Sequence, residues 1–198
     1  MNARKQILDP RIARTRNAVE VSVIKLLNNE RPFGSLTISE VAKDAGITRK
    51  TLYARFGTLE RVIKDMASSM FEEISDNITD DMLQVPLTDS VLTTVVFRAH
   101  EQHRSILTPL LMYCPGFLFV EPCREVIGKL LDRVIRVNDF QPLPAFEREY
   151  LTAIHCSTLH ATLTVWVERG FVDSPDKLAE LIVKLLGPGV DKFLKSLG

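Results

Sequence analysis

The sequence predicts an all-α fold, and three observations lead to this prediction. Apolar residues recur at helical spacing along nearly all of the 198 residues. No segment shows a convincing alternation of apolar and polar residues, the pattern of a half-buried strand. Threonines precede several periodic segments and glycines follow them, as helix caps do. With 45% apolar residues, the chain is also able to bury a substantial core.

The first two helices are separated by a short loop. Apolar residues from Ile12 to Leu27 repeat at helical spacing and predict a helix over about residues 11–29. The segment ERPFGS then contains Pro and Gly and predicts a loop. Thr37 has Glu40 three residues on, which is the spacing of a capping box, so a short second helix is expected to begin there.

A glycine separates the second helix from the third. Gly46 is placed to end the second helix, and Thr48 to cap a third in which Leu52 and Phe56 point inward. After Gly57, a long fourth helix is expected. Its apolar stripe consists of Leu59, Val62, Ile63, Met66, Met70 and Ile74.

Five further helices are expected in the rest of the chain. We place them near residues 89–102, 104–113, 119–138, 143–170 and 174–195. Pro109 is expected to kink or shorten the second of these. The last is expected to be interrupted at Gly187, Pro188 and Gly189.

Two short helices joined by a tight, glycine-containing turn predict a helix-turn-helix motif. If Leu52 and Phe56 face the core, the other side of the third helix is cationic and hydroxyl-bearing, and a helix of this diameter fits the DNA major groove. The candidate base contacts are Arg49, Lys50 and Thr51, and the candidate phosphate contacts are Tyr53 and Arg55, with Thr37 and Thr48 at helix N-termini.

The charge distribution favours an anionic partner for the N-terminal part. Residues 1–64 carry 13 Lys and Arg against 6 Asp and Glu, whereas residues 65–198 carry 12 against 19. The chain as a whole has no net charge, which conceals this asymmetry. Chance asymmetry of solvated surfaces is the alternative explanation.

Residues 16–66 resemble the DNA-binding domain of the tetracycline-repressor (TetR) family of transcription regulators. The similarity rests on TISEVAKDAGITRKTLYARF followed by GTLERVI. Two departures stand out: Lys50 occupies a position that is usually small, and Leu59 replaces a Lys that contacts phosphate in the family, with Arg61 nearby as a partial substitute. The resemblance implies a DNA-binding domain over residues 1–57 and a ligand-binding and dimerisation domain over residues 58–198.

The resemblance also implies a ligand-responsive repressor that binds a palindromic operator in double-stranded DNA as a homodimer. A small-molecule pocket usually has apolar walls with a few polar groups. The candidate residues for such a pocket are Phe97, His100, Leu107, Tyr113, Phe117, His155, Leu159 and Trp166. Apolar stripes on the last two helices are the candidate dimer interface: Leu163, Trp166, Leu178, Leu181, Ile182 and Leu185. Ordinary intramolecular core is the alternative for both sets.

Other functions have less support in the sequence. The four His residues lack metal-site spacing, and adjacent His155 and Cys156 would not face each other on a helix, so neither a metal site nor a catalytic pair is predicted. An all-α enzyme and a protein-interaction module are the rival classes. The N-terminus lacks a signal peptide's apolar run, and the three Cys form no CxxC motif. We therefore expect a cytoplasmic protein without cofactor or membrane association.

Overall fold

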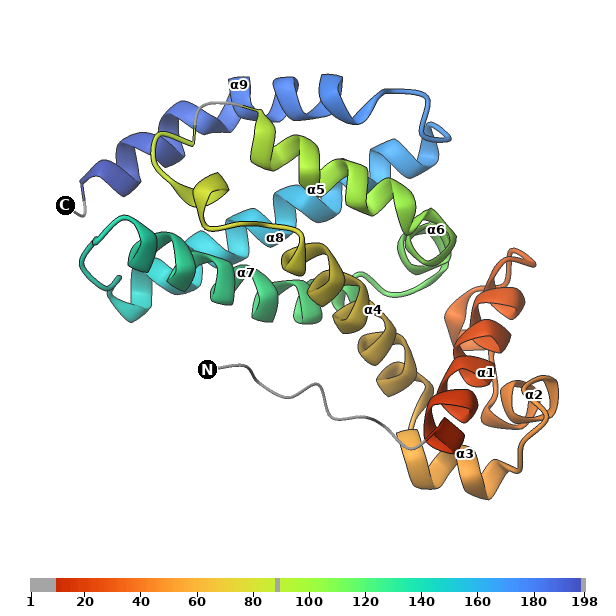
Figure 1. The fold of residues 1–198 in the computed structure, drawn as a ribbon. Helices are drawn as coiled ribbons and strands as arrows, with labels where there is room; N and C mark the ends of the chain where they lie inside the picture. Colours follow the sequence, from red (N-terminus) through yellow and green to blue (C-terminus); the bar gives the residue numbers. More distant parts are fainter. Residues whose placement is uncertain (1–9, 88–89, 197–198) are drawn as a thin grey trace. The chain divides into compact units, whose positions relative to one another are not determined.

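The computed structural model describes residues 10–87 and 90–196, and these contain helices and no strand (Figure 1). The expected all-α class is confirmed. The α-helices are α1 (Pro10–Leu27), α2 (Ile38–Asp44), α3 (Arg49–Phe56), α4 (Leu59–Asp76), α5 (Val91–Gln102), α6 (Arg104–Tyr113), α7 (Phe117–Val137), α8 (Ala145–Glu168) and α9 (Pro175–Lys195). Two 3-10 turns, η1 (Phe33–Ser35) and η2 (Asp81–Leu83), lie in the connections.

The chain divides into two compact units, one ending at Ile63 and the next beginning at Lys64. This division falls inside α4, whereas the sequence placed a domain boundary before residue 58. The first turns of α4 belong to the N-terminal unit because Leu59, Val62 and Ile63 are buried there. Helix α4 therefore begins in one unit and continues into the other.

The N-terminal unit is built on a small aliphatic core to which α1, α2 and α3 each contribute. Helix α2 contacts both α1 and α3. The Ser22 hydroxyl of α1 donates to the Val41 carbonyl of α2 at 3.2 Å, and Lys25 pairs with Asp44 at 2.6 Å. The described residues of this unit that are exposed by 1% or less are Val19, Ser22, Val23, Leu27, Val41, Ala42, Leu52 and Val62.

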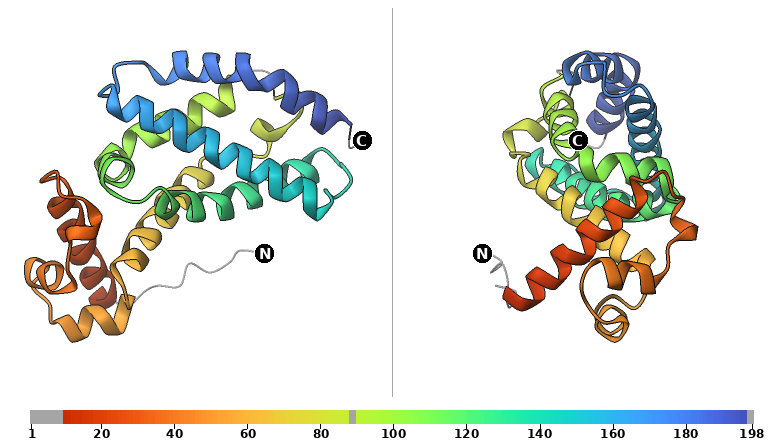
Figure 2. Two further views of the ribbon diagram at one scale, coloured as in Figure 1. Left: turned by 180° about the vertical axis from the view of Figure 1, so that it is seen from behind. Right: turned by 90° about the vertical axis from the view of Figure 1, so that its right-hand side faces the viewer.

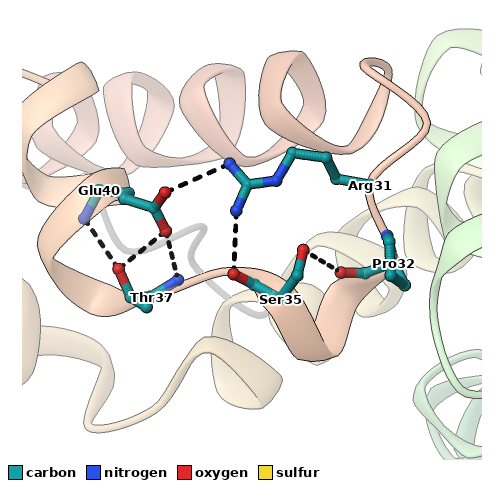
Figure 3. A network of polar contacts seen from close by, with 5 residues as sticks. All are labelled: Arg31, Pro32, Ser35, Thr37 and Glu40. Carbon is teal, nitrogen blue, oxygen red and sulfur yellow. Dashed lines mark hydrogen bonds and ion pairs between the residues drawn. The ribbon is translucent and has the colours of Figure 1, made fainter.

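The predicted capping box at the start of α2 is present (Figure 3). The Glu40 amide donates to the Thr37 hydroxyl at 3.3 Å, and the Thr37 amide donates to the Glu40 carboxylate at 3.0 Å. Arg31 donates both to that carboxylate and to the Ser35 carbonyl. The network fixes the loop that leads into the helix-turn-helix, and its hydrogen bonds lower the pKa of Glu40.

The second unit is a helical bundle in which α5 packs on α9, and α8 packs on α6 and α7 (Figures 1 and 2). Aromatic side chains fill part of its core. The Trp166 ring lies edge-on to Phe97, with centroids 5.7 Å apart, and to Phe171 at 4.9 Å. Its indole N–H donates to the Asp173 carbonyl at 2.8 Å, so the chain's one tryptophan is fully partnered.

The expected shortening of α6 and the expected interruption of α9 are both absent. Helix α6 continues through Pro109, and α9 continues through Gly187, Pro188 and Gly189. A proline inside a helix removes one backbone hydrogen bond, but Pro109, Gly187 and Leu194 are all buried in the bundle. Tertiary packing therefore outweighs the local preference that predicted a break.

His100 is a fully buried imidazole on α5. Its Nδ1 donates to the Val96 carbonyl at 2.8 Å, and its ring lies edge-on to Phe71. Nε2 finds no hydrogen-bond partner among the described residues. Burial, together with the nearby His103, lowers the pKa of His100 to about 4, although the bond to Val96 opposes this shift.

This histidine is expected to make the second unit sensitive to acid. The His100 ring binds a proton more weakly in the folded state than in the unfolded chain. The contribution of the neutral ring to the free energy of unfolding is therefore complete above about pH 6.5 and is lost as pH falls toward 4. We expect the free energy of unfolding to be about 2 kcal/mol lower at pH 5 than at pH 7.5 because of this group. Urea denaturation followed by Trp166 fluorescence measures it. His100→Phe should remove that part of the pH dependence, and an equal loss in both proteins would contradict the assignment.

Candidate nucleic-acid interface and effector cavity

The turn between α2 and α3 has the hydrogen bonds of a Schellman motif. The Ile47 amide donates to the Ala42 carbonyl at 2.9 Å, and the Gly46 amide donates to the Lys43 carbonyl at 3.2 Å. Gly46 adopts φ +67°, a conformation that side chains with a Cβ rarely adopt. The predicted role of this glycine is confirmed, and it sets the direction in which α3 leaves α2.

Helix α3 is held at its start and its middle. The Thr48 hydroxyl accepts from the Thr51 amide at 3.0 Å, which is the predicted N-cap. Leu52 is completely buried and Phe56 partly buried, so the expected inward face is correct. The opposite face is thereby directed to solvent.

The outward face of α3 carries three cations and a phenol. Arg49, Lys50 and Arg55 are exposed, and the Tyr53 side chain is 67% exposed. A tyrosine this exposed adds little to packing within the unit, which leaves its ring and hydroxyl available to a partner. Thr51 lies at the edge of this face, half-buried, and its hydroxyl shares a 2.9 Å hydrogen bond with that of Thr48.

Thr37 and Leu59 are less suited to contact phosphate than the residues on α3. Thr37 is exposed, but both its amide and its hydroxyl are bonded to Glu40, whose carboxylate would repel a phosphate. Leu59 is buried, with 7% of its surface exposed, so it contributes to the core at the position where the family's Lys would contact phosphate. Arg61, two residues further along the chain, is exposed.

The second unit contains a cavity of about 250 Å³ between α5, α7, α8 and α9. Of the residues predicted to line a pocket, Phe97, His155 and Leu159 do so. The remaining predicted residues lie elsewhere: His100, Leu107 and Trp166 are buried in the core, Tyr113 is half-buried and Phe117 is 47% exposed. The spacing of apolar residues could not distinguish those that line the cavity from those in the core, because both groups are apolar and lie on helices.

Sequence reasoning missed most of the cavity wall. The aliphatic wall comes from α7 and α9 and from residues near η2, such as Leu130, Val134, Val190 and Ile78. One signal was available in α8, whose largely apolar sequence contains several threonines. Thr152, Thr158 and Thr162 all line the cavity.

The proposed dimer residues also divide by burial. Leu163 and Trp166 are enclosed within the unit, at 0% and 1% exposure, so they offer no surface to a second chain. Leu178 and Ile182 are half-buried, and Ile182 faces the cavity. Leu181 and Leu185 are exposed on α9. On α8 the large apolar residues that are exposed are Phe146, Tyr150, Ile154 and Val165, none of which the sequence singled out.

Two of the three cysteines are enclosed in the second unit. Cys123 on α7 and Cys156 on α8 are hydrogen-bonded to each other, which together with burial raises the pKa of Cys123, whereas the same bond lowers the pKa of Cys156. Cys156 has no exposed surface, so its thiol is not accessible to a reagent in solution. Burial raises the pKa of Cys114 to about 12. Protonated thiols are poor nucleophiles. His155 does not contact Cys156 as a base, since its Nδ1 donates to the Leu151 carbonyl at 2.8 Å.

Within residues 10–87 and 90–196, no group of three His, Cys, Asp or Glu side chains is placed to hold a metal ion. None of the helices in these ranges has the length and apolar character of a membrane span.

Sequence comparison connects the helix-turn-helix to known regulators. Residues 26–66 match the family described as bacterial regulatory proteins, tetR family. The chain is also 31% identical over 75 residues to YxbF, an HTH-type transcriptional regulator of Bacillus subtilis strain 168. That match covers 38% of this chain and about a fifth (20%) of the relative's length.

Solved structures share the fold over nearly the whole chain. NalD, the secondary repressor of the MexAB-OprM multidrug efflux pump in Pseudomonas aeruginosa, is 22% identical with a TM-score of 0.57 over 90% of this chain and 96% of its own. AlkX, a TetR family repressor from Dietzia sp., is 21% identical with a TM-score of 0.55, covering 93% and 97%. DhaS, a dihydroxyacetone kinase operon activator, is 15% identical with a TM-score of 0.55, covering 91% and 97%. Residues 26–66 therefore match the tetR family of bacterial regulatory proteins, and the chain as a whole shares the fold of these solved structures.

Proposed function

We propose that this protein is a sequence-specific DNA-binding transcriptional regulator that acts as a homodimer and as a ligand-responsive repressor. The observation that carries the proposal is the outward face of α3, where Arg49, Lys50 and Tyr53 are exposed on a helix whose other side is anchored by Leu52. This arrangement is suited to the DNA major groove.

The side chains of α3 divide into two roles. Arg49 and Lys50, near the N-terminus of the helix, are long enough to donate to guanine O6 and N7. The Thr51 methyl suits a thymine methyl, because its hydroxyl is already bonded to Thr48. Tyr53 and Arg55 suit phosphates, which fix register rather than sequence. Thr48 supports the N-terminus of α3, whereas Thr37 is the weaker candidate because Glu40 occupies its donors.

A dimer provides the two reading helices that a palindromic operator requires, about 34–36 Å apart. Viewed from behind, α8 crosses the front of the second unit with α9 above it (Figure 2). The exposed apolar residues of these helices are the proposed interface: Phe146, Tyr150, Ile154, Val165, Leu181 and Leu185. Two helices from each of two chains would form a four-helix contact.

The proposed response to ligand is a shift between conformations with different DNA affinity. In the described part of the chain, α4 is the helix that belongs to both units. Ile78, just beyond the end of α4, lines the cavity. A ligand that repositions Ile78 would therefore also move α4, whose first turns belong to the unit that contains the helix-turn-helix. Repression rather than activation is supported by NalD and AlkX, while DhaS is described as an activator.

Binding-site selection from random duplex DNA tests the proposal as a whole. The full chain is expected to enrich an inverted repeat, with affinity that falls steeply as salt rises because bound phosphates release counterions. Fusion of the selected site to a reporter promoter then distinguishes repression from activation. Enrichment of no sequence, or binding insensitive to salt, would refute the DNA-binding role.

Substitutions on α3 are expected to separate sequence reading from phosphate contact. Arg49→Ala should reduce discrimination at one base pair by about 1–3 kcal/mol. Tyr53→Phe, which removes only a hydroxyl, should weaken binding by the same factor on every DNA sequence, because a phosphate contact does not depend on the base. Fluorescence anisotropy with the selected site and single-base variants measures both. Arg104→Ala, which removes an exposed guanidinium from the second unit, is the control and should leave affinity unchanged.

An acidic residue in the proposed interface is expected to dissociate the dimer. Leu185 is 66% exposed, so Leu185→Asp should change the stability of the isolated chain by less than about 0.5 kcal/mol. Sedimentation velocity should then show monomer where the unsubstituted protein is dimeric. Val91→Asp, at an exposed apolar position at the start of α5, is the matched control. A Leu185→Asp protein that stays dimeric would place the interface elsewhere.

A further inference from the structure

The cavity of the second unit is apolar except at a few positions, most of which lie on α8. Its polar lining consists of Thr152, His155, Thr158 and Thr162 from α8 and Thr93 from α5. Among the described residues that line it, none is Lys, Arg, Asp or Glu. This lining therefore favours an uncharged ligand whose polar group lies next to α8 and whose remaining surface is apolar.

Thr152 is the polar group for which the fold itself gives no reason. Its side chain is 3% exposed and lines the cavity, and its hydroxyl finds no hydrogen-bond partner among the described residues. Threonines inside helices commonly donate to a carbonyl one turn earlier, as Thr164 does to His160 at 2.8 Å. A buried hydroxyl left without a partner is destabilising, so the Thr152 hydroxyl calls for a partner that the described residues do not provide.

His155 provides a complementary atom one turn along the same face. Its Nδ1 lies 2.8 Å from the Leu151 carbonyl, which can only accept, so Nδ1 carries the hydrogen. In the neutral ring Nε2 is then an acceptor. Residues three apart on a helix are neighbours, which brings the Thr152 donor and the His155 acceptor to the same part of the cavity wall.

We propose that the effector of this regulator is an uncharged aliphatic alcohol of medium chain length, a refinement that rests on the proposed function. The ligand hydroxyl accepts from Thr152 and donates to His155 Nε2, and the alkyl chain packs on the aliphatic wall. One hydroxyl satisfies both groups because it is a donor and an acceptor at once. A carbonyl oxygen would satisfy only Thr152.

The size of the cavity sets the length of the chain. A cavity of about 150 Å³ accommodates benzene. In proportion, the 250 Å³ here accommodates about ten non-hydrogen atoms, close to the size of octanol. A carboxylate would lose its hydration without meeting a cation, and an ammonium would do so without meeting an anion, which makes both poor ligands.

A matched panel of ligands tests the proposal on the full chain without DNA. The panel is 1-octanol, n-nonane, octanoate and octylammonium, which are similar in size. Calorimetric titration gives the affinities. Trp166 fluorescence gives an independent readout, because its ring contacts Phe97 in the cavity wall. We expect octanol to bind with one site per chain, about tenfold more tightly than nonane and at least about a hundredfold more tightly than either ion.

Thr152→Val tests the role of the hydroxyl at nearly constant shape. It should reduce the preference for octanol over nonane and leave the affinity for nonane unchanged. Because valine replaces a hydroxyl without a partner, the melting temperature should stay the same or rise, so a folding defect is not expected. Thr164→Val, on the same helix but away from the cavity lining, is the control and should keep the preference. Equal affinity for octanol and nonane, or tighter binding of octanoate, would overturn the proposal.

Failure of this refinement is distinguishable from failure of the proposed function. If octanol binds but leaves operator affinity unchanged, the ligand class stands and the regulatory role is wrong. If a charged or aromatic molecule displaces the protein from its operator while octanol does not bind, the regulatory role stands and the ligand class is wrong.

Discussion

The orientation of α3 depends on one buried contact and one turn. Leu52 has no exposed surface, and the Gly46 turn fixes how the helix leaves α2 through the bond from the Ile47 amide to the Ala42 carbonyl. Rotation of α3 by a quarter turn would expose the apolar Leu52 side chain to water and bury a cation without a partner, and both changes raise the free energy of the folded state. The same constraint that stabilises the small N-terminal unit therefore presents Arg49, Lys50 and Tyr53 to solvent, and the proposed DNA recognition follows from it.

Helix α8 has the corresponding role in the second unit, where it serves three surfaces at once. One side is buried against α6 and α7 and includes Leu163 and Trp166. A second lines the cavity with Thr152 and His155, and a third exposes apolar side chains such as Tyr150. A helix that is apolar around most of its circumference is expected to be covered on all sides. In an isolated chain the third surface is uncovered, which supports a second copy as its partner.

The buried polar groups of the second unit have different explanations. His100 pairs one nitrogen with Val96 and keeps the other in an apolar site, and a lowered pKa keeps the ring neutral there. Asp191 is buried close to the end of α9, where its Oδ2 forms an ion pair with Lys195 at 2.7 Å and its Oδ1 finds no partner among the described residues. Thr152 has neither kind of compensation and faces an open volume. This difference is what separates a structural polar group from a candidate ligand contact.

The amino-acid pattern was enough to predict the parts of this protein whose structure is local. The capping box of Thr37, the glycine turn after α2 and the inward position of Leu52 all involve residues within about a helical turn of each other, so their pattern is visible in the chain. Tertiary structure alone decided which side of α8 is core, cavity or surface, because an apolar helix has no periodicity that distinguishes them. It also decided that α9 continues through Pro188, since packing of the bundle compensates for the hydrogen bond that proline removes.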